Sequence, residues 1–249
     1  MKSYIITTEN NYGRKPDLTY YPKALPKPDL FYGVTKENFE VPEWWLNIHG
    51  ENYDGQDSRG IFCCGKSKEL LLRQHKEQYP DEDALLMEDD VFFIPEASEK
   101  YDRFMESVPN DWALIYLGGW HSYNTKGMYP LEVKPGVLRV FMDAGNEALI
   151  VRANVIDEVI EHITHSPVNV FTHVDWHLTA IQHRHPCYSP LGYIAGQQDG
   201  YSVICRYDRK MGIWNDFLYE GIDRKVHAYG NPRYDCAHHS GCKCGSCHK

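Results

Sequence analysis

Short apolar segments alternate with segments of helical periodicity along most of this 249-residue chain. The apolar segments are typical of buried strands, and the longer segments carry apolar side chains on one helical face. This alternation predicts an α/β fold, in which a Rossmann-like, mostly parallel sheet has helices on both faces. Strands are expected at residues 4–8, 30–34, 84–87, 112–117, 137–142, 147–151 and 201–205, and helices at residues 67–78, 97–107, 154–162 and 174–183.

Two stretches are expected to be irregular. Residues 11–30 are rich in Tyr, Pro and Lys, and residues 42–60 contain three glycines. Turn-forming residues at this density disfavour regular elements. The strand at 112–117 is expected to stop at Gly118 and Gly119, because glycine weakens the interior of a strand.

Length, charge and hydropathy restrict the class of protein. The length fits one large α/β domain or two small ones. The net charge of −9, from 35 acidic and 26 basic residues, argues against a nucleic-acid partner that covers the whole surface. No apolar window of about 18 residues predicts a membrane span, and the apolar part of the N-terminus is too short for a signal peptide. We therefore expect a cytoplasmic protein with reduced thiols.

Three consecutive carboxylates interrupt the apolar sequence "ALLMEDDVFF" at residues 84–93. Adjacent carboxylates repel one another and resist burial unless a positive charge neutralises them. Carboxylate oxygens suit Mg²⁺ or Mn²⁺, and alternate residues of an extended segment share a face. Glu88 and Asp90 are therefore expected to bind a cation while Asp89 points away. The alternative is a solvated turn, but the apolar residues on both flanks favour the metal site.

This acidic motif resembles that of glycosyltransferases with the GT-A fold, and it is most similar to family 25, which includes lipopolysaccharide and collagen sugar transferases. Other segments resemble that family's motifs in the same order, so that the resemblance covers residues 4–204. They are "GIFCCGKSKELLLRQH" (60–75), "DWALIYLGG" (111–119), "GNEALIVRANVIDEVIEH" (145–162), "HVDWHLTAI" (173–181) and "GYIAGQQDGYSVI" (192–204). The chain departs from the family at Ser67-Lys68, where a Ser-His pair is usual, and in the tail, which has no counterpart.

The resemblance implies a metal-dependent, inverting transfer of a hexose from a nucleotide diphosphate sugar, with UDP as the expected nucleotide, to an acceptor hydroxyl. By the same resemblance, Asp90 would be the main ligand of Mn²⁺ or Mg²⁺. Glu88 would assist through the ribose or a metal-bound water, and Asp89 would bind the donor or support the site. The acceptor would be a glycan, a protein side chain or another hydroxyl-bearing molecule.

Inversion in one displacement requires a general base beside the acceptor. The first candidate is Asp175, which lies where a helix is expected to begin, next to a Trp that would stack on a sugar. The alternative for Asp175 is a helix N-cap. The second candidate is Glu147, and its alternative is an ordinary charge at a strand edge.

Two groups of residues are expected to bind the donor near the ends of strands. Thr7, Thr8 and Arg14 follow the first strand, where GT-A folds hold the nucleotide. Gln198 lies in a late polar segment that would complete the donor site. The alternative for all four is an ordinary loop or polar turn.

A glycine pair and the two residues after it form a further candidate donor site. Gly118 and Gly119 would let a ligand approach the backbone closely, since neither carries a side chain. Trp120 and His121 would then line the sugar site. The alternative is a tight turn followed by a packed Trp.

Four of the eight cysteines crowd the end of the chain: Cys236, Cys242, Cys244 and Cys247. The Cys-x-x-Cys spacing suits tetrahedral zinc, and we expect a structural zinc site in a short terminal lobe. The alternatives are a disordered tail with reactive thiols, or disulfides formed in an oxidising compartment. The chain is accordingly divided into a glycosyltransferase-like domain, residues 1–206, and a C-terminal extension, residues 207–249.

Two other functions remain open at this stage. The same carboxylates would serve a metal-dependent nuclease or phosphotransferase, although such an enzyme would want a basic groove that the composition does not indicate. The other alternative is a zinc-stabilised binding module in which the acidic triplet is only structural.

Overall fold

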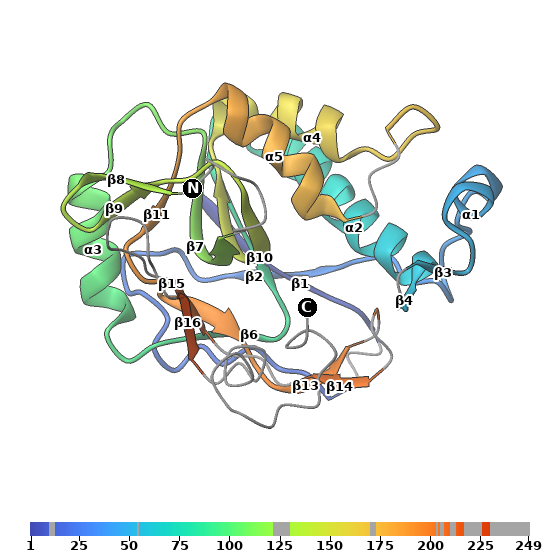
Figure 1. Ribbon diagram of the computed structural model, residues 1–249, viewed down its shortest axis with the longest axis horizontal. Helices are drawn as coiled ribbons and strands as arrows, with labels where there is room; N and C mark the ends of the chain where they lie inside the picture. Colours follow the sequence, from blue (N-terminus) through green and yellow to red (C-terminus); the bar gives the residue numbers. More distant parts are fainter. Residues whose placement is uncertain are drawn as a thin grey trace, which may run out of the picture.

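The computed structural model describes most of the chain and contains one large sheet with helices on both faces (Figure 1). The described residues are 1–9, 13–53, 55–121, 130–169, 173–202, 204, 207–209, 213–216 and 226–229; only the backbone is described at 120, 121, 201 and from 207 onward.

The central sheet has eight strands in the order β2-β1-β5-β10-β7-β11-β9-β8. Their bounds are β1 Lys2–Thr7, β2 Asp29–Tyr32, β5 Ala84–Glu88, β7 Leu114–His121, β8 Leu131–Lys134, β9 Val137–Arg139, β10 Asp143–Val151 and β11 Cys187–Pro190. Pairing of β1 with β2 and β5 is parallel, as is pairing of β7 with β11, whereas β10 and β9 run antiparallel to their neighbours. The predicted α/β class is confirmed, with these two strands reversed in a sheet that otherwise runs one way.

Five α-helices are described: α1 Glu43–His49, α2 Ser58–Gln78, α3 Ala97–Ser107, α4 Ile156–Ile163 and α5 Val174–Arg184, with a 3₁₀ turn, Ala153–Val155, leading into α4. Helices α2, α4 and α5 lie together on one face of the sheet, and α3 lies on the other (Figure 1). No described helix combines the length and the apolar character that a membrane span requires.

Successive residues of the central strands face opposite layers of the core. In β5, Leu86 packs in the cluster with α2, α4 and α5, whereas Leu85 and Met87 pack in the cluster with α3. In β7, Tyr116 and Ile115 divide in the same way. Because both faces are covered, β5 is apolar from Ala84 to Met87 and β7 has no charged residue from Leu114 to Leu117, which explains the continuous apolar runs in the sequence.

The prediction of an irregular segment at residues 42–60 is wrong for much of its length, because α1 and the first turn of α2 lie within it. The α2 helix begins nine residues before the predicted start at Ser67, since the first residue of α2 is Ser58. The Asp57 side chain caps this end by accepting hydrogen bonds from the backbone N–H groups of Arg59 and Gly60. An N-cap of this kind offsets the low helix propensity of a glycine in the first turn.

The prediction that β7 stops at Gly118 is also wrong, because the strand continues to His121. A Cβ on Gly118 would lie 2.9 Å from the Ala195 carbonyl oxygen, and one on Gly119 would lie 2.9 Å from the Ala144 carbonyl oxygen. The two glycines therefore allow neighbouring backbone to approach β7 closely rather than ending it.

Four small antiparallel pairs complete the described fold: β3 Asn52–Tyr53 with β4 Gln56–Asp57, β6 Val91–Phe93 with β12 Ala195–Gln197, β13 Gly200–Ser202 with β14 Tyr207–Arg209, and β15 Ile213–Asp216 with β16 Val226–Tyr229. The boundary expected at residues 206 and 207 lies between the paired strands β13 and β14. Pairing of β6 with β12 holds the turn after β5 in place, and this turn carries Asp89 and Asp90, whereas Glu88 is the last residue of β5.

Candidate active site

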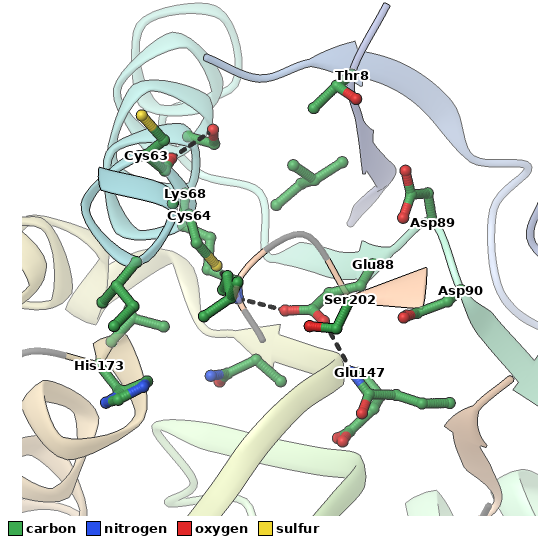
Figure 2. A pocket seen from close by; sticks show the side chains of 18 of the residues that line it. Thr8, Cys63, Cys64, Lys68, Glu88, Asp89, Asp90, Glu147, His173 and Ser202 are labelled. Atoms are coloured by element: carbon green, nitrogen blue, oxygen red, sulfur yellow. Dashed lines mark hydrogen bonds and ion pairs between the residues drawn. The ribbon is translucent and has the colours of Figure 1, made fainter. Parts of the chain in front are cut away.

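A cavity of about 590 Å³ opens at the carboxyl ends of β1 and β5 (Figure 2). Its wall is completed by the N-terminal half of α2, the N-terminal half of β10 and the first turn of α5. Carboxyl ends of parallel strands are where α/β sheets gather ligands, because side chains from several connections meet there.

Nine of the residues expected from the sequence line this cavity: Thr7, Thr8, Arg14, Glu88, Asp89, Asp90, Glu147, Asp175 and Gln198. Gly118 and Gly119 are not among the lining residues, and the space above them is taken by protein backbone. Trp120 and His121 continue β7, and their side chains are outside the described part of the chain, as are Cys236, Cys242, Cys244 and Cys247.

Glu88 is held by two side chains: Lys68, to which no function was assigned from the sequence, and Gln197, which lies in the late polar segment expected to complete the metal or donor site. Lys68 reaches from α2 and places Nζ 2.7 Å from Glu88 Oε1, and Gln197 Nε2 donates to Glu88 Oε2 at 3.0 Å (Figure 2). Lys68 is itself buried, with 4% of its side chain exposed. Burial opposes ionisation of Glu88, but the charge and hydrogen bond of Lys68, together with the Arg14 charge and the Gln197 hydrogen bond, outweigh burial and lower the pKa of Glu88. The departure from the family pattern at Ser67-Lys68 is the one sequence feature that marks this residue, and no role was assigned to Lys68 from it.

Asp89 and Asp90 lie together against Arg14, so the expectation that Asp89 points away from the site is wrong. Arg14 Nη1 lies 3.5 Å from Asp89 Oδ1 and 3.1 Å from Asp90 Oδ2. Thr7 Oγ1 also donates to Asp89 Oδ2 at 2.9 Å. Burial, followed by the nearby Glu88 charge, raises the pKa of Asp90 to about 7. The Asp90 Oδ1 atom is buried and accepts no hydrogen bond from the residues that the structure describes.

The two candidate bases, Asp175 and Glu147, lie on different elements. Asn146 donates a hydrogen bond to Asp175 and directly precedes Glu147 in the sequence. Asp175 is in the first turn of α5, and its Oδ1 accepts a hydrogen bond from Asn146 Nδ2. Burial raises the pKa of Asp175 to about 6. Glu147 is 2% exposed, and burial followed by the Glu88 charge raises its pKa well above the ordinary value. Asn146 was missed because an uncharged residue in a predicted strand gives no local signal of function.

A bulge in β10 brings Asn146 and Glu147 to the same cavity. Pairing of β10 with β7 shifts register between Ala144 and Ala148. Within this bulge, Gly145 has φ of +82°, a conformation that residues with a Cβ rarely adopt. Adjacent residues of a regular strand point to opposite faces, so the bulge is what places both side chains in one wall.

Gln198 lines the cavity mainly as a structural support. Its backbone N–H donates to the Asp90 carbonyl oxygen at 2.8 Å, and its side-chain Nε2 donates to the Lys15 carbonyl oxygen at 2.8 Å. These bonds connect the loop that carries Arg14 to the turn that carries the acids.

The residues present fit a divalent cation. Six carboxylates line the cavity (Glu37, Glu88, Asp89, Asp90, Glu147 and Asp175), and Lys68 and Arg14 are cations paired with members of this set. Asp90 Oδ1 is a buried carboxylate oxygen with no protein partner in the described chain, and such hard oxygens suit Mg²⁺ or Mn²⁺. Among the described residues no three His, Cys, Asp or Glu side chains form a ready metal site. A cation here would take further ligands from a bound diphosphate or water, as Mg²⁺ commonly does.

Comparison with protein-family models and with curated proteins gives no match. Among solved structures, the chain is similar to A197 from STIV, at 12% identity and a TM-score of 0.42, over 88% of this chain and 97% of that one. It is also similar to a glycosyltransferase involved in the glycosylation of the major capsid of PBCV-1, at 16% identity and a TM-score of 0.35, over 75% of this chain and 79% of that one. At these scores the two likenesses assign no function, and the functional argument rests on the site.

Proposed function

We propose that this chain is a metal-dependent glycosyltransferase that moves a hexose from a nucleotide diphosphate sugar, with UDP as the nucleotide, to an acceptor hydroxyl with inversion. The observation that carries the proposal is the Glu-Asp-Asp triplet at the carboxyl end of β5. It lies in a cavity with the buried cation of Lys68 and the partly exposed cation of Arg14, and Asp90 Oδ1 there has no protein partner among the described residues. The ordered sequence resemblance to family 25 supports the same reading.

The donor would bind along the β1 side of the cavity. Arg14 and Thr8 would face the diphosphate, and Asp90 would hold Mn²⁺ or Mg²⁺, which when bound supplies Lewis-acid neutralisation of the leaving diphosphate. Both oxygens of Glu88 are engaged by Lys68 and Gln197, so Glu88 would assist from outside the metal's ligand set.

The acceptor would approach from the α5 side. Asp175 would accept the proton of the acceptor hydroxyl, since it is a carboxylate at neutral pH with a pKa of about 6. Asn146 would keep this carboxylate in one orientation through its hydrogen bond to Oδ1. Glu147 would remain the second candidate for the base.

Thermal shift with UDP, GDP and CMP, each with and without Mn²⁺, tests the proposal. We expect stabilisation by one nucleoside diphosphate only when the metal is present, because the cation bridges the carboxylate and the phosphates. Asp90→Asn should abolish this stabilisation, whereas Asp102→Asn, an exposed acid on α3, should leave it unchanged. No response to any nucleotide, or a normal response in Asp90→Asn, would overturn the proposed site. Nicking of plasmid DNA that Asp90→Asn abolishes would favour the nuclease instead.

A further inference from the structure

Among the described Lys and Arg side chains that line the cavity, Lys68 is the most deeply buried. Its side chain is 4% exposed, whereas those of Arg14 and Lys36 are 23% and 31% exposed. Lys68 lies on α2, where its Nζ is 3.8 Å from Cys64 Sγ, one helical turn earlier (Figure 2). A lysine is rarely buried to this extent unless its charge is paired, so the carboxylates that face Lys68 indicate its role.

Two carboxylates from different elements interact with the Lys68 ammonium group. Glu88, the last residue of β5, forms an ion pair with it at 2.7 Å. Asp175, in the first turn of α5, is close enough that its charge and the Lys68 charge act on each other. Burial alone would lower the pKa of Lys68, but Cys64 and these two carboxylates outweigh burial and raise it. Lys68 is therefore a permanent positive charge that Glu88 and Asp175 share.

The Glu88 carboxylate is fixed from two sides, although it is open to the cavity. Lys68 holds Oε1, and Gln197 on β12 donates to Oε2 at 3.0 Å. The Glu88 side chain is still 26% exposed and lines the cavity, so a cation could reach it if Lys68 were absent. Asp90, by contrast, is paired with the partly exposed Arg14. An exposed ion pair is easier to break than a buried one, so a cation displaces Arg14 more readily than Lys68.

We infer that Lys68 is a positioning residue that keeps Glu88 out of the metal's ligand set and so limits the cavity to one divalent cation. This inference rests on the proposed function, in which Asp90 holds the cation, and it adds a role for Lys68. The Lys68 ammonium group already neutralises Glu88 and Asp175, the carboxylates that a second cation would need. Two-metal sites are typical of phosphatases and nucleases, so Lys68 also distinguishes this cavity from that alternative.

The test counts the Mn²⁺ ions bound by the full chain at neutral pH, from the loss of the electron paramagnetic resonance signal of free Mn²⁺. The wild-type protein should bind about one ion per chain, and Asp90→Asn should lose it. Lys68→Met should bind about two, because Glu88 and Asp175 lose their protein cation and become available to a metal.

Two further variants show whether the additional ion depends on Glu88. Lys68→Met/Glu88→Gln removes the ion pair as a whole and should return the count to about one. A count of about two in this double variant would overturn the inference, whether or not Lys68→Met folds. Lys66→Met is the matched control, because Lys66 lies on the same helix, pairs with Glu69 at 3.0 Å and is not among the residues that line the cavity. It should bind about one ion, as the wild-type protein does.

The outcomes distinguish this inference from the function on which it rests. Failure of the wild-type protein to bind Mn²⁺ would overturn the metal dependence of the proposed function and the role of Lys68 together. About two ions in the wild-type protein, or an unchanged count of about one in a folded Lys68→Met, would overturn the role of Lys68 alone. The second of these results would leave Lys68 with a purely structural role.

Discussion

Replacing Gly145 with alanine should destabilise the protein and deform the site at the same time. The residue has φ of +82°, and an added Cβ would lie 2.7 Å from Glu147 Oε2 and 3.0 Å from Gly119 Cα. The left-handed conformation alone costs an L-residue about 1–2 kcal/mol. The Glu147 carboxylate is buried and cannot swing away freely, and overpacking of this kind adds about 1–3 kcal/mol.

Gly136→Ala is a matched control for the free-energy cost of placing an L-residue in a left-handed backbone conformation. Its φ is +79°, close to that of Gly145, but an added Cβ would meet no atom within 4 Å. Gly136→Ala should therefore cost only the conformational strain, about 1–2 kcal/mol. The difference between the two variants isolates the displacement of Glu147.

Urea unfolding followed by tryptophan fluorescence measures both losses. We expect Gly145→Ala to lose about 2–5 kcal/mol and Gly136→Ala about 1–2 kcal/mol, with similar m-values. Equal losses of stability in the two variants would refute the steric argument.

Three further predictions follow from other parts of the molecule. Lys68→Met leaves a partly buried carboxylate uncompensated and should cost about 3 kcal/mol in urea unfolding, with partial recovery in Lys68→Met/Glu88→Gln; full additivity of the two changes would contradict the ion pair. Burial raises the Asp175 pKa to about 6, so kcat/KM for transfer should be full above this pH and fall as pH drops through about 6; a profile flat across about pH 5–8 would exclude Asp175 as the base. The full chain, purified under reducing conditions, should contain about one zinc ion by atomic emission and lose it in Cys244→Ser/Cys247→Ser; a metal-free wild-type chain would contradict the tail site.

The helices and strands that the sequence predicts well are those with a strong local pattern. The expected helix at 97–107 coincides with α3, because its apolar residues recur on one face and Pro95 precedes it. The expected strand at 84–87 lies within β5 for a similar reason, since a short apolar run has few alternatives. Prediction failed where glycine was taken as a break, at the start of α2 and at Gly118, because packing and capping outweighed local propensity.

The residues of the candidate site differ in the same way, because some have a local sequence signal and others do not. Glu88, Asp89 and Asp90 stand out locally, since three charges inside an apolar run require neutralisation. The partners of Glu88 do not stand out, because Lys68, which forms its ion pair, precedes it by twenty residues, and Gln197, which donates a hydrogen bond to it, follows it by more than a hundred. The functional roles of the acids remain predictions, but their meeting in one cavity is a property of the fold.

By itself, the sequence determined the α/β class, the main core elements and the position of the acidic triplet at a strand end, because these depend on periodicity and charge over a few adjacent residues. Only the tertiary structure decided that β10 runs antiparallel between β5 and β7 and bulges at Gly145. It alone decided that Asn146 and Glu147 line the same cavity as the triplet and Asp175. Such contacts depend on strand order and register, which bring together residues that no local pattern connects.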